Sequence, residues 1–217
     1  KIEEISLAAN IELDEIQKEA VKKAISEKIL IITGSPGTGK STILNVAITC
    51  FEHLGKTVTV GAPTGRASKR LSEATGRDAK TIHRLLKYQP KINRFLKDEN
   101  NPIDTDVLII DEASMIDIRL FKSLLKAVKK STSLVLVGDI DQLPAVGPGN
   151  ILSDMISSKS FSVVRLEHIY RQEGKSRIIH NAHLIRDGLY PVLSESDNKD
   201  FFFINKTESE LVIEAIE

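Results

Sequence analysis

Residues 34–41 have the types and spacing that bind a chain of phosphates. They read GSPGTGKS, which satisfies GxxxxGK[ST], and they lie between an apolar run at residues 29–33 and helix-forming residues. Glycines let backbone N–H groups curl around an anion, Lys40 can reach the β and γ phosphates, and the Ser41 hydroxyl can meet Mg²⁺. An ordinary glycine-rich turn is the alternative, but strand, loop and helix occur in the required order. We predict a phosphate-binding P-loop with contacts from Gly34, Ser35, Pro36, Gly37, Thr38, Gly39, Lys40, Ser41 and Thr42.

Two adjacent carboxylates follow the apolar run at residues 107–110. Asp111 can hold the hydration shell of Mg²⁺, and Glu112 can polarise a water molecule for in-line attack on the γ phosphate. A strand that ends in acidic residues is commonplace, so this pair gains its meaning from the P-loop. Gln142 follows the next apolar run, residues 134–137, and can contact the γ phosphate, although an ordinary loop amide is an equal alternative.

Two further polar residues have both a structural and a functional interpretation. Arg171 can stabilise charge on a transferring phosphoryl group as an arginine finger, but a lone arginine is usually a surface residue. Gln17 stands at the third position of a helix predicted to begin after Asp14. That local pattern favours the back-bonding half of a capping box. The local sequence does not decide between the structural and the functional interpretation of either residue.

The elements that must position these residues alternate between strand and helix. Apolar β-rich runs occur at residues 29–33, 57–61, 107–110 and 134–137, and each leads into a short loop and a helical pattern. This order predicts an α/β fold with a parallel sheet and helices on both faces, so functional residues should lie at the carboxyl ends of the strands. Residues 87–101 break the pattern and predict either a small hairpin or an irregular surface loop.

Composition limits the class of protein. The 217 residues include 30 basic and 30 acidic side chains, one cysteine, no signal peptide and no apolar run of membrane-spanning length. We expect a reduced cytoplasmic setting, no membrane partner, and one domain over residues 13–217 that follows the end of a preceding segment at residues 1–12. Residues 65–97 hold ten Lys or Arg against two acidic residues, which favours a polyanion partner over a solvated face.

The motifs together resemble a known family. In chain order they are LDEIQKEAV, GSPGTGKST, APTGRASKRL, TIHRLL, IIDEASMID, LVGDIDQLPAVGPG and LEHIYRQ. The series resembles the amino-terminal RecA-like motor domain, 1A, of superfamily 1 DNA helicases, in the RecD and TraA group that includes the exodeoxyribonuclease V alpha subunit. The resemblance implies ATP and Mg²⁺ as cofactors, and ATP-driven movement along single-stranded DNA, 5′ to 3′, in DNA repair or recombination.

The resemblance also implies roles for individual residues. Gln17 is similar to an adenine-contacting glutamine, Gln142 to a γ-phosphate sensor, and Arg171 to the motif IV arginine, while Lys40, Asp111 and Glu112 keep their catalytic roles. Mg²⁺ would be held by Ser41 and, through water, by Asp111. Contacts to the DNA backbone are expected from Pro63, Thr64, Gly65, Thr81, His83 and Arg84, joined by Arg66 and Lys69 of the basic stretch.

Related helicases need more than this chain supplies. A second RecA-like domain of the full-length chain should provide another arginine to the ATP, and nothing after Arg186 resembles it. Residues 87–101 correspond to a hairpin, the pin, against which the duplex is split, and subunits of a nuclease complex are further expected partners. Two rivals remain: a GTPase or small-molecule kinase, prompted by residues 205–208, and a nucleotide-gated scaffold, against which Glu112 argues.

Overall fold

The computed structural model describes residues 4–5, 11–168, 176–193 and 200–201. The chain divides into two compact units, residues 1–169 and 170–217. The boundary between the units follows β8 (Ser162–Leu166), the last strand of the main sheet among the described residues. One domain over residues 13–217 stays a prediction. At the other end, Ile5 and Ile11, from the stretch predicted to end a preceding segment, pack against the core of the first unit.

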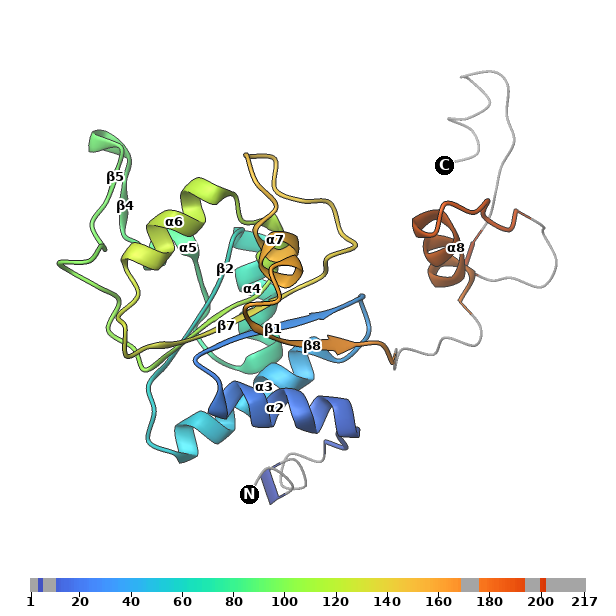
Figure 1. Ribbon diagram of the computed structural model, residues 1–217, viewed down its shortest axis with the longest axis horizontal. Coiled ribbons are helices and arrows are strands. Elements are labelled where there is room, and N and C mark those ends of the chain that lie inside the picture. Colours follow the sequence, from blue (N-terminus) through green and yellow to red (C-terminus); the bar gives the residue numbers. More distant parts are fainter. Residues whose placement is uncertain (1–3, 6–10, 169–175, 194–199, 202–217) are drawn as a thin grey trace. The chain divides into compact units, whose positions relative to one another are not determined.

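The first unit is organised around a six-stranded sheet in which every pair of neighbouring strands is parallel (Figure 1). This confirms the predicted parallel sheet. In spatial order the strands are β3 (Lys80–Thr81), β2 (Val58–Ala62), β6 (Val107–Ile110), β7 (Ser133–Gly138), β1 (Ile29–Gly34) and β8. The two-residue strand β3 was not predicted, because two residues are too short for an apolar run.

Helices cover both faces of this sheet. Successive strand residues point to opposite faces, so Leu30 and Ile32 enter one core while Ile31 enters the other. One core lies against α2 (Glu15–Ser26), α3 (Lys40–His53) and α4 (Gly65–Thr75), and the other against α5 (Ile82–Leu85), α6 (Ile118–Lys126) and α7 (Ile151–Ser157). The predicted three-layer α/β architecture is therefore confirmed.

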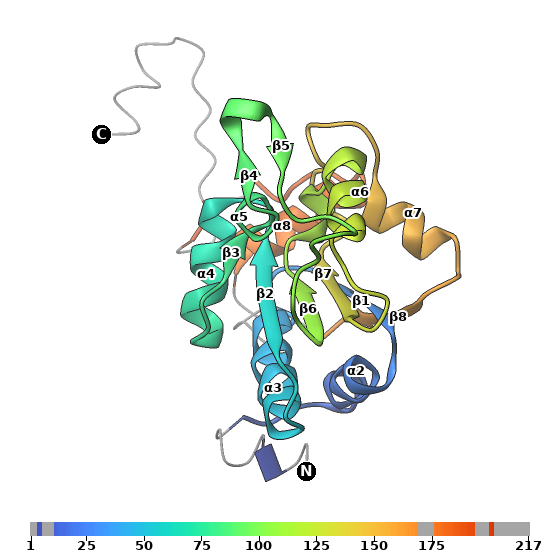
Figure 2. The ribbon, with the colours of Figure 1, turned by 90° about the vertical axis from the view of Figure 1, so that its left-hand side faces the viewer.

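A small hairpin interrupts the alternation after α5. Its strands are β4 (Tyr88–Gln89) and β5 (Arg94–Phe95), which pair antiparallel across the 3₁₀ turn η1 (Pro90–Ile92). Asn93 closes the turn in the left-handed region and accepts a 2.6 Å hydrogen bond from the Tyr88 hydroxyl. Figure 2 shows the hairpin projecting beyond α5. Of the two alternatives for residues 87–101, hairpin or irregular loop, the structure has the hairpin.

The second unit contains α8 (Arg177–Arg186). Asn181 is buried, and its side-chain amide forms two hydrogen bonds with the backbone of Val192, of 3.1 Å and 2.8 Å, so the chain at Val192 is held beside the helix. Within the described part of the chain, no helix is both long enough and apolar enough to cross a bilayer.

Candidate nucleotide-binding site

Three adjacent strands bring the predicted catalytic residues to one rim of the sheet. β7 lies between β1 and β6, with Thr33 of β1 opposite Gly138 and Ile110 of β6 opposite Leu136. The strands are parallel, so the loops after all three leave from the same edge. The P-loop follows β1, the two carboxylates follow β6, and the loop with Gln142 follows β7.

The P-loop between β1 and α3 depends on its glycines. Gly37 and Gly39 have φ angles of 91° and 83°, a region that side-chain-bearing residues rarely adopt, and Gly39 is the N-cap of α3. A Cβ on Gly34 would approach both Leu166 and the Thr38 hydroxyl to 2.8 Å. Thr38 is buried, and its hydroxyl donates a 2.9 Å hydrogen bond to the Ser35 carbonyl. The loop therefore closes on itself just before the first turn of α3.

Lys40 begins α3 and folds its ammonium group over the loop. It donates hydrogen bonds to the carbonyl oxygens of Gly34 and Ser35, the latter at 3.0 Å. Burial lowers the pKa of Lys40, and the charges of Asp139, Asp111 and Glu112 oppose that change. The three carboxylates thus favour the charged form of the lysine, in the loop where phosphates would lie.

Asp111 and Glu112 directly follow β6, and the backbone of Glu112 has an unusual conformation. Glu112 has a φ of 53°, an uncommon left-handed angle for a residue other than glycine, and its N–H donates a 2.9 Å hydrogen bond to Asp111 Oδ1. Burial raises the pKa of Asp111 to about 6, opposed by that hydrogen bond. Glu112 Oε2 is buried without a hydrogen-bond partner among the described residues. Neither carboxylate is fully compensated, and a hydrated cation and a water molecule would supply what the two groups lack.

Replacing Asp111 with Asn is expected to stabilise the nucleotide-free chain above pH 6. A carboxyl whose pKa rises from 3.8 to about 6 on folding opposes folding once it is ionised, so the penalty grows with pH between those values and is complete above them. Asp111→Asn should therefore raise the free energy of unfolding by about 1–3 kcal/mol at pH 7.5, and by little near pH 4. Chemical unfolding at both pH values measures the difference.

Asp106→Asn is the matched control, and it should change the free energy of unfolding in the opposite direction. Hydrogen bonds from the backbone N–H and hydroxyl of Thr57, 2.8 Å and 2.9 Å long, lower the pKa of Asp106. Its ionised form favours folding, so this substitution should destabilise the chain at pH 7.5 and have little effect once the pH falls below the lowered pKa of Asp106. A gain for Asp111→Asn that is equal at both pH values would contradict the assignment of its cost to ionisation.

A third carboxylate, Asp139, lies at the same pocket, and no catalytic role was predicted for it. It follows β7 directly and is only 2% exposed. Its oxygens accept a 3.0 Å hydrogen bond from the Asp141 N–H and a 3.3 Å hydrogen bond from the Gln142 side chain. Asp139 therefore holds the amide of Gln142 while its charge acts on Lys40. The available sequence signal was a carboxylate directly after a fully apolar strand.

Gln17 joins the start of α2 to the P-loop. Its N–H donates to Asp14 Oδ1 at 2.6 Å and its Oε1 accepts from the Asp14 N–H at 3.1 Å, so the capping box is present. The remaining amide group donates to the Thr38 carbonyl at 3.4 Å, and Gln17 is buried. Capping accounts for the amide oxygen of this side chain, and the amide nitrogen already contacts the P-loop.

The predicted DNA-contacting residues gather at the same edge of the sheet, beyond β6. Ala62 of β2 lies opposite Thr81, so the loops after β2 and β3 are neighbours. Thr64 caps α4 and Thr81 caps α5, each accepting a backbone N–H at 3.2 Å through its hydroxyl oxygen. A hydroxyl that accepts in this way keeps its proton free to donate. Gly65 at the start of α4, together with His83 and Arg84, is exposed, and Pro63 is half-buried.

The structure divides the basic stretch into paired and unpaired side chains. Arg77 forms a 2.5 Å ion pair with Glu52, and Lys80 forms a 3.0 Å ion pair with Asp78. Within the described part of the chain, the exposed residues Arg66, Lys69, Arg70 and Arg84 have no ion pair. The carboxyl-end rim therefore keeps its positive charges available. Arg171 lies outside the described residues, and its predicted role stays a prediction.

Comparisons with known proteins agree with this geometry. Residues 17–148 match the family model AAA_19, an AAA domain. The ATP-dependent RecD2 DNA helicase of Deinococcus radiodurans is 40% identical over 82% of this chain, and the RecBCD enzyme subunit RecD of Mycolicibacterium smegmatis is 37% identical over 65% of it. The crystal structure of the Pif1 helicase from Candida albicans superposes with a TM-score of 0.66 at 30% identity, covering 83% of this chain.

The matched region is only a small part of each of those proteins. The chain spans 24% of the RecD2 helicase, 30% of the RecD subunit and 45% of the Pif1 chain. The P-loop, the parallel sheet and the structural likeness establish an α/β P-loop NTPase fold of the RecA-like type. The chain belongs to the AAA_19 family of AAA domains and is a RecD-like superfamily 1 helicase motor domain.

Proposed function

We propose that this chain is the first motor domain of an ATP-dependent DNA helicase that moves along single-stranded DNA in the 5′ to 3′ direction. The observation that carries the proposal is the position of Lys40. Its ammonium group lies over the P-loop and within the field of Asp111 and Glu112, which follow β6, and of Asp139, which follows β7. That arrangement suits triphosphate hydrolysis better than simple nucleotide capture, because a pure switch has little need of a buried base.

Each residue of the site has a role in this chemistry. Lys40 and the backbone N–H groups of residues 34–41 would bind the phosphates, and Glu112, with its unpaired buried oxygen, would orient and deprotonate the attacking water. Mg²⁺ prefers oxygen ligands, so the Ser41 hydroxyl and Asp111 fit it, the latter through water. When bound, the ion neutralises charge on the phosphates. Gln142 would respond to the γ phosphate by exchanging its bond to Asp139 for one to nucleotide.

The DNA would lie across the rim formed after β2 and β3. Thr64, Thr81 and the helix N-termini offer donors to phosphates, and Arg66, Lys69 and Arg84 supply charge. The rings of His83, Tyr88 and Phe95 lie 5.2–5.6 Å apart, which joins the base of the hairpin to this rim. We assign the hairpin the role of a pin that separates the duplex.

A second RecA-like domain would complete the motor. It would close over the nucleotide from the open rim and add an arginine to the one expected from Arg171. The family resemblance of the motifs implies a role in DNA repair or recombination. One relative is named as a subunit of the RecBCD enzyme, which supports subunits of a larger enzyme complex, expected to be a nuclease, as partners. The test is ATP hydrolysis by the full-length protein with and without single-stranded DNA. A rate that DNA leaves unchanged would contradict the proposal.

Replacing Gln17 with Ala is expected to reduce the preference for ATP over GTP while leaving the binding of pyrophosphate unchanged. The side chain lies at the P-loop through Thr38, where its amide can reach a base. Asp14→Ala is the control, because it breaks the same capping box, at a cost of about 1 kcal/mol, without removing the amide. Nucleotide titrations of both variants separate the roles. An equal loss of ATP preference in the two variants would assign the effect to capping alone.

A further inference from the structure

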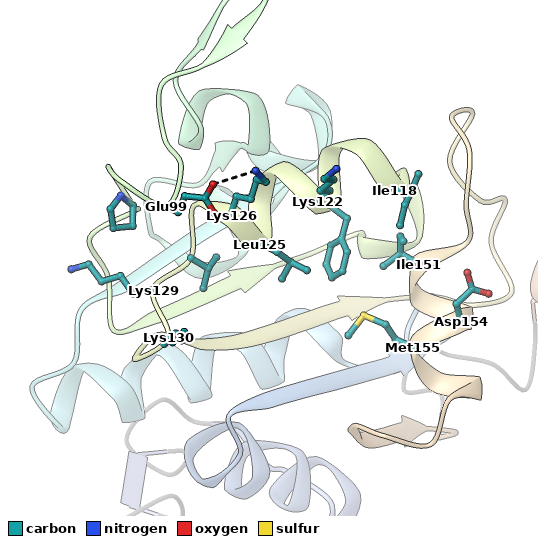
Figure 3. A pocket seen from close by; sticks show the side chains of 13 residues that line it. Glu99, Ile118, Lys122, Leu125, Lys126, Lys129, Lys130, Ile151, Asp154 and Met155 are labelled. Carbon is teal, nitrogen blue, oxygen red and sulfur yellow. Dashed lines mark hydrogen bonds and ion pairs between the residues drawn. The ribbon is translucent and has the colours of Figure 1, made fainter.

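A groove on the face of the first unit away from α2 and α3 belongs to none of the sites described above. It lies between α6 and α7 and has a volume of about 980 Å³. Figure 3 shows Leu125, Ile151 and Met155 turned toward the same space. Ile118 and Leu125 are 45% and 44% exposed, a large fraction for aliphatic side chains of a helix that packs on a core. The apolar floor consists of Ile118, Phe121, Leu125, Val128, Ile151 and Met155.

Lysines surround one side of this floor. Lys122, Lys126, Lys129 and Lys130 line the groove, and the acidic residues that line it are Glu99 and Asp154. Glu99 is paired with Lys126 at 3.2 Å, while Lys129 is paired with Asp104 at 2.5 Å. Among the described residues Lys122 and Lys130 have no ion pair, and in Figure 3 Asp154 lies at the opposite end of the groove from Lys129 and Lys130. The edge of the groove between α6 and α7 therefore carries net positive charge beside its apolar floor.

We propose that this groove binds an acidic amphipathic helix of a partner protein. A helix lays an apolar stripe of side chains at i, i+3, i+4 and i+7 into such a groove, and its flanking carboxylates would meet the unpaired Lys122 and Lys130. α6 itself is nine residues long, or about 14 Å, so two to three turns of a partner helix would match its length. The apolar anchors supply affinity, and the charges supply orientation and a faster encounter.

The apolar floor of the groove favours a protein helix over nucleic acid as the occupant. Single strands bind proteins through a basic track with exposed aromatic rings for the bases. The aromatic residue of this groove, Phe121, is only 7% exposed, and the exposed surface is aliphatic. The candidate DNA rim, in contrast, has its ring cluster at His83, Tyr88 and Phe95. The two surfaces therefore call for different partners.

The probe is a helical peptide of about 14 residues with Leu at the stripe positions and Glu on both flanks, a length at which an isolated helix is marginal in water. Fluorescence anisotropy with the full-length protein should show binding that weakens as salt rises. A peptide with Ala in place of Leu, and one with Lys in place of Glu, should each bind at least about tenfold more weakly. Equal binding by either altered peptide, or no binding of the original, would overturn the proposal.

Substitutions in the protein locate the site. Leu125→Asp and the double variant Lys122→Glu with Lys130→Glu should each weaken peptide binding about tenfold or more. Leu54→Asp and Lys56→Glu are matched controls at exposed positions after α3, and they should bind the peptide as the unaltered protein does. The thermal unfolding midpoint checks that the variants fold. Displacement of the peptide by a single-stranded oligonucleotide, or a loss of self-association in Leu125→Asp, would assign the groove to DNA or to a second copy instead.

Discussion

Glu112→Gln is expected to lower ATP hydrolysis by the full-length protein by a factor of about 10²–10⁴ while ATP binding changes little. The substitution keeps the size of the side chain and removes the carboxylate that would accept a proton from water. Glu112 is held in a left-handed conformation, and one of its oxygens is buried with no partner in the part of the chain that the structure describes. The residue is therefore positioned by the fold before any ligand arrives. Steady-state hydrolysis and a binding titration with the same nucleotide measure the two quantities.

Lys40→Ala is the comparison that tests the division of roles. The lysine donates to the carbonyl oxygens of Gly34 and Ser35 where phosphates would lie, so its removal should weaken ATP binding itself. A charge-assisted hydrogen bond to phosphate is worth about 1.5–3 kcal/mol, or roughly tenfold to a hundredfold in affinity. If both variants weakened binding to the same extent, Glu112 would be a binding residue and the assignment of a base would be wrong.

Reversing two charges on the basic rim, Lys69→Glu with Arg84→Glu, is expected to abolish the stimulation of ATP hydrolysis by single-stranded DNA. Both side chains are exposed and lack ion pairs among the described residues, and they belong to α4 and α5, whose N-termini meet at the ends of β2 and β3. Removing one lysine or arginine from a DNA phosphate should reduce the slope of log affinity against log salt by about 0.7. The double variant should therefore show a slope that is lower by about 1.4.

The control for this experiment changes net charge by the same amount elsewhere. Lys22→Glu with Lys56→Glu alters two exposed lysines on α2 and after α3, away from the ends of β2 and β3. It should retain DNA stimulation and the original salt slope. ATP binding should be the same in both double variants, because neither touches the P-loop. Full stimulation by DNA in the Lys69→Glu, Arg84→Glu variant would show that residues 65–97 form an ordinary solvated surface and that DNA binds elsewhere.

Local interactions made part of this molecule predictable from the sequence. The P-loop was predictable because glycine spacing and a following helix act over a few residues, and Gly37 and Gly39 have the positive φ angles that such a loop requires. The capping box of Asp14 and Gln17 was predictable because both partners lie within one helical turn. The buried strands were predictable because a parallel sheet covered on both faces needs continuous apolar runs.

Interactions between residues distant in sequence were decided only by the tertiary structure. Asp139 acts on Lys40 because β7 pairs with β1, a neighbour relation that no local pattern encodes. Arg77 looked like part of a basic track until the fold placed it beside Glu52.

The same holds for surfaces built from two elements. The groove between α6 and α7 exists because two separately amphipathic helices cover neighbouring parts of one sheet face. The hairpin of β4 and β5 formed from residues whose sequence also suited a loop, since Tyr88 and Phe95 pack across its ladder and against His83. Sequence determines which elements form when the stabilising partners lie within a turn or a strand. Where a partner lies on another element, its energy becomes available only after the chain has folded, and only the fold determines which side chains meet.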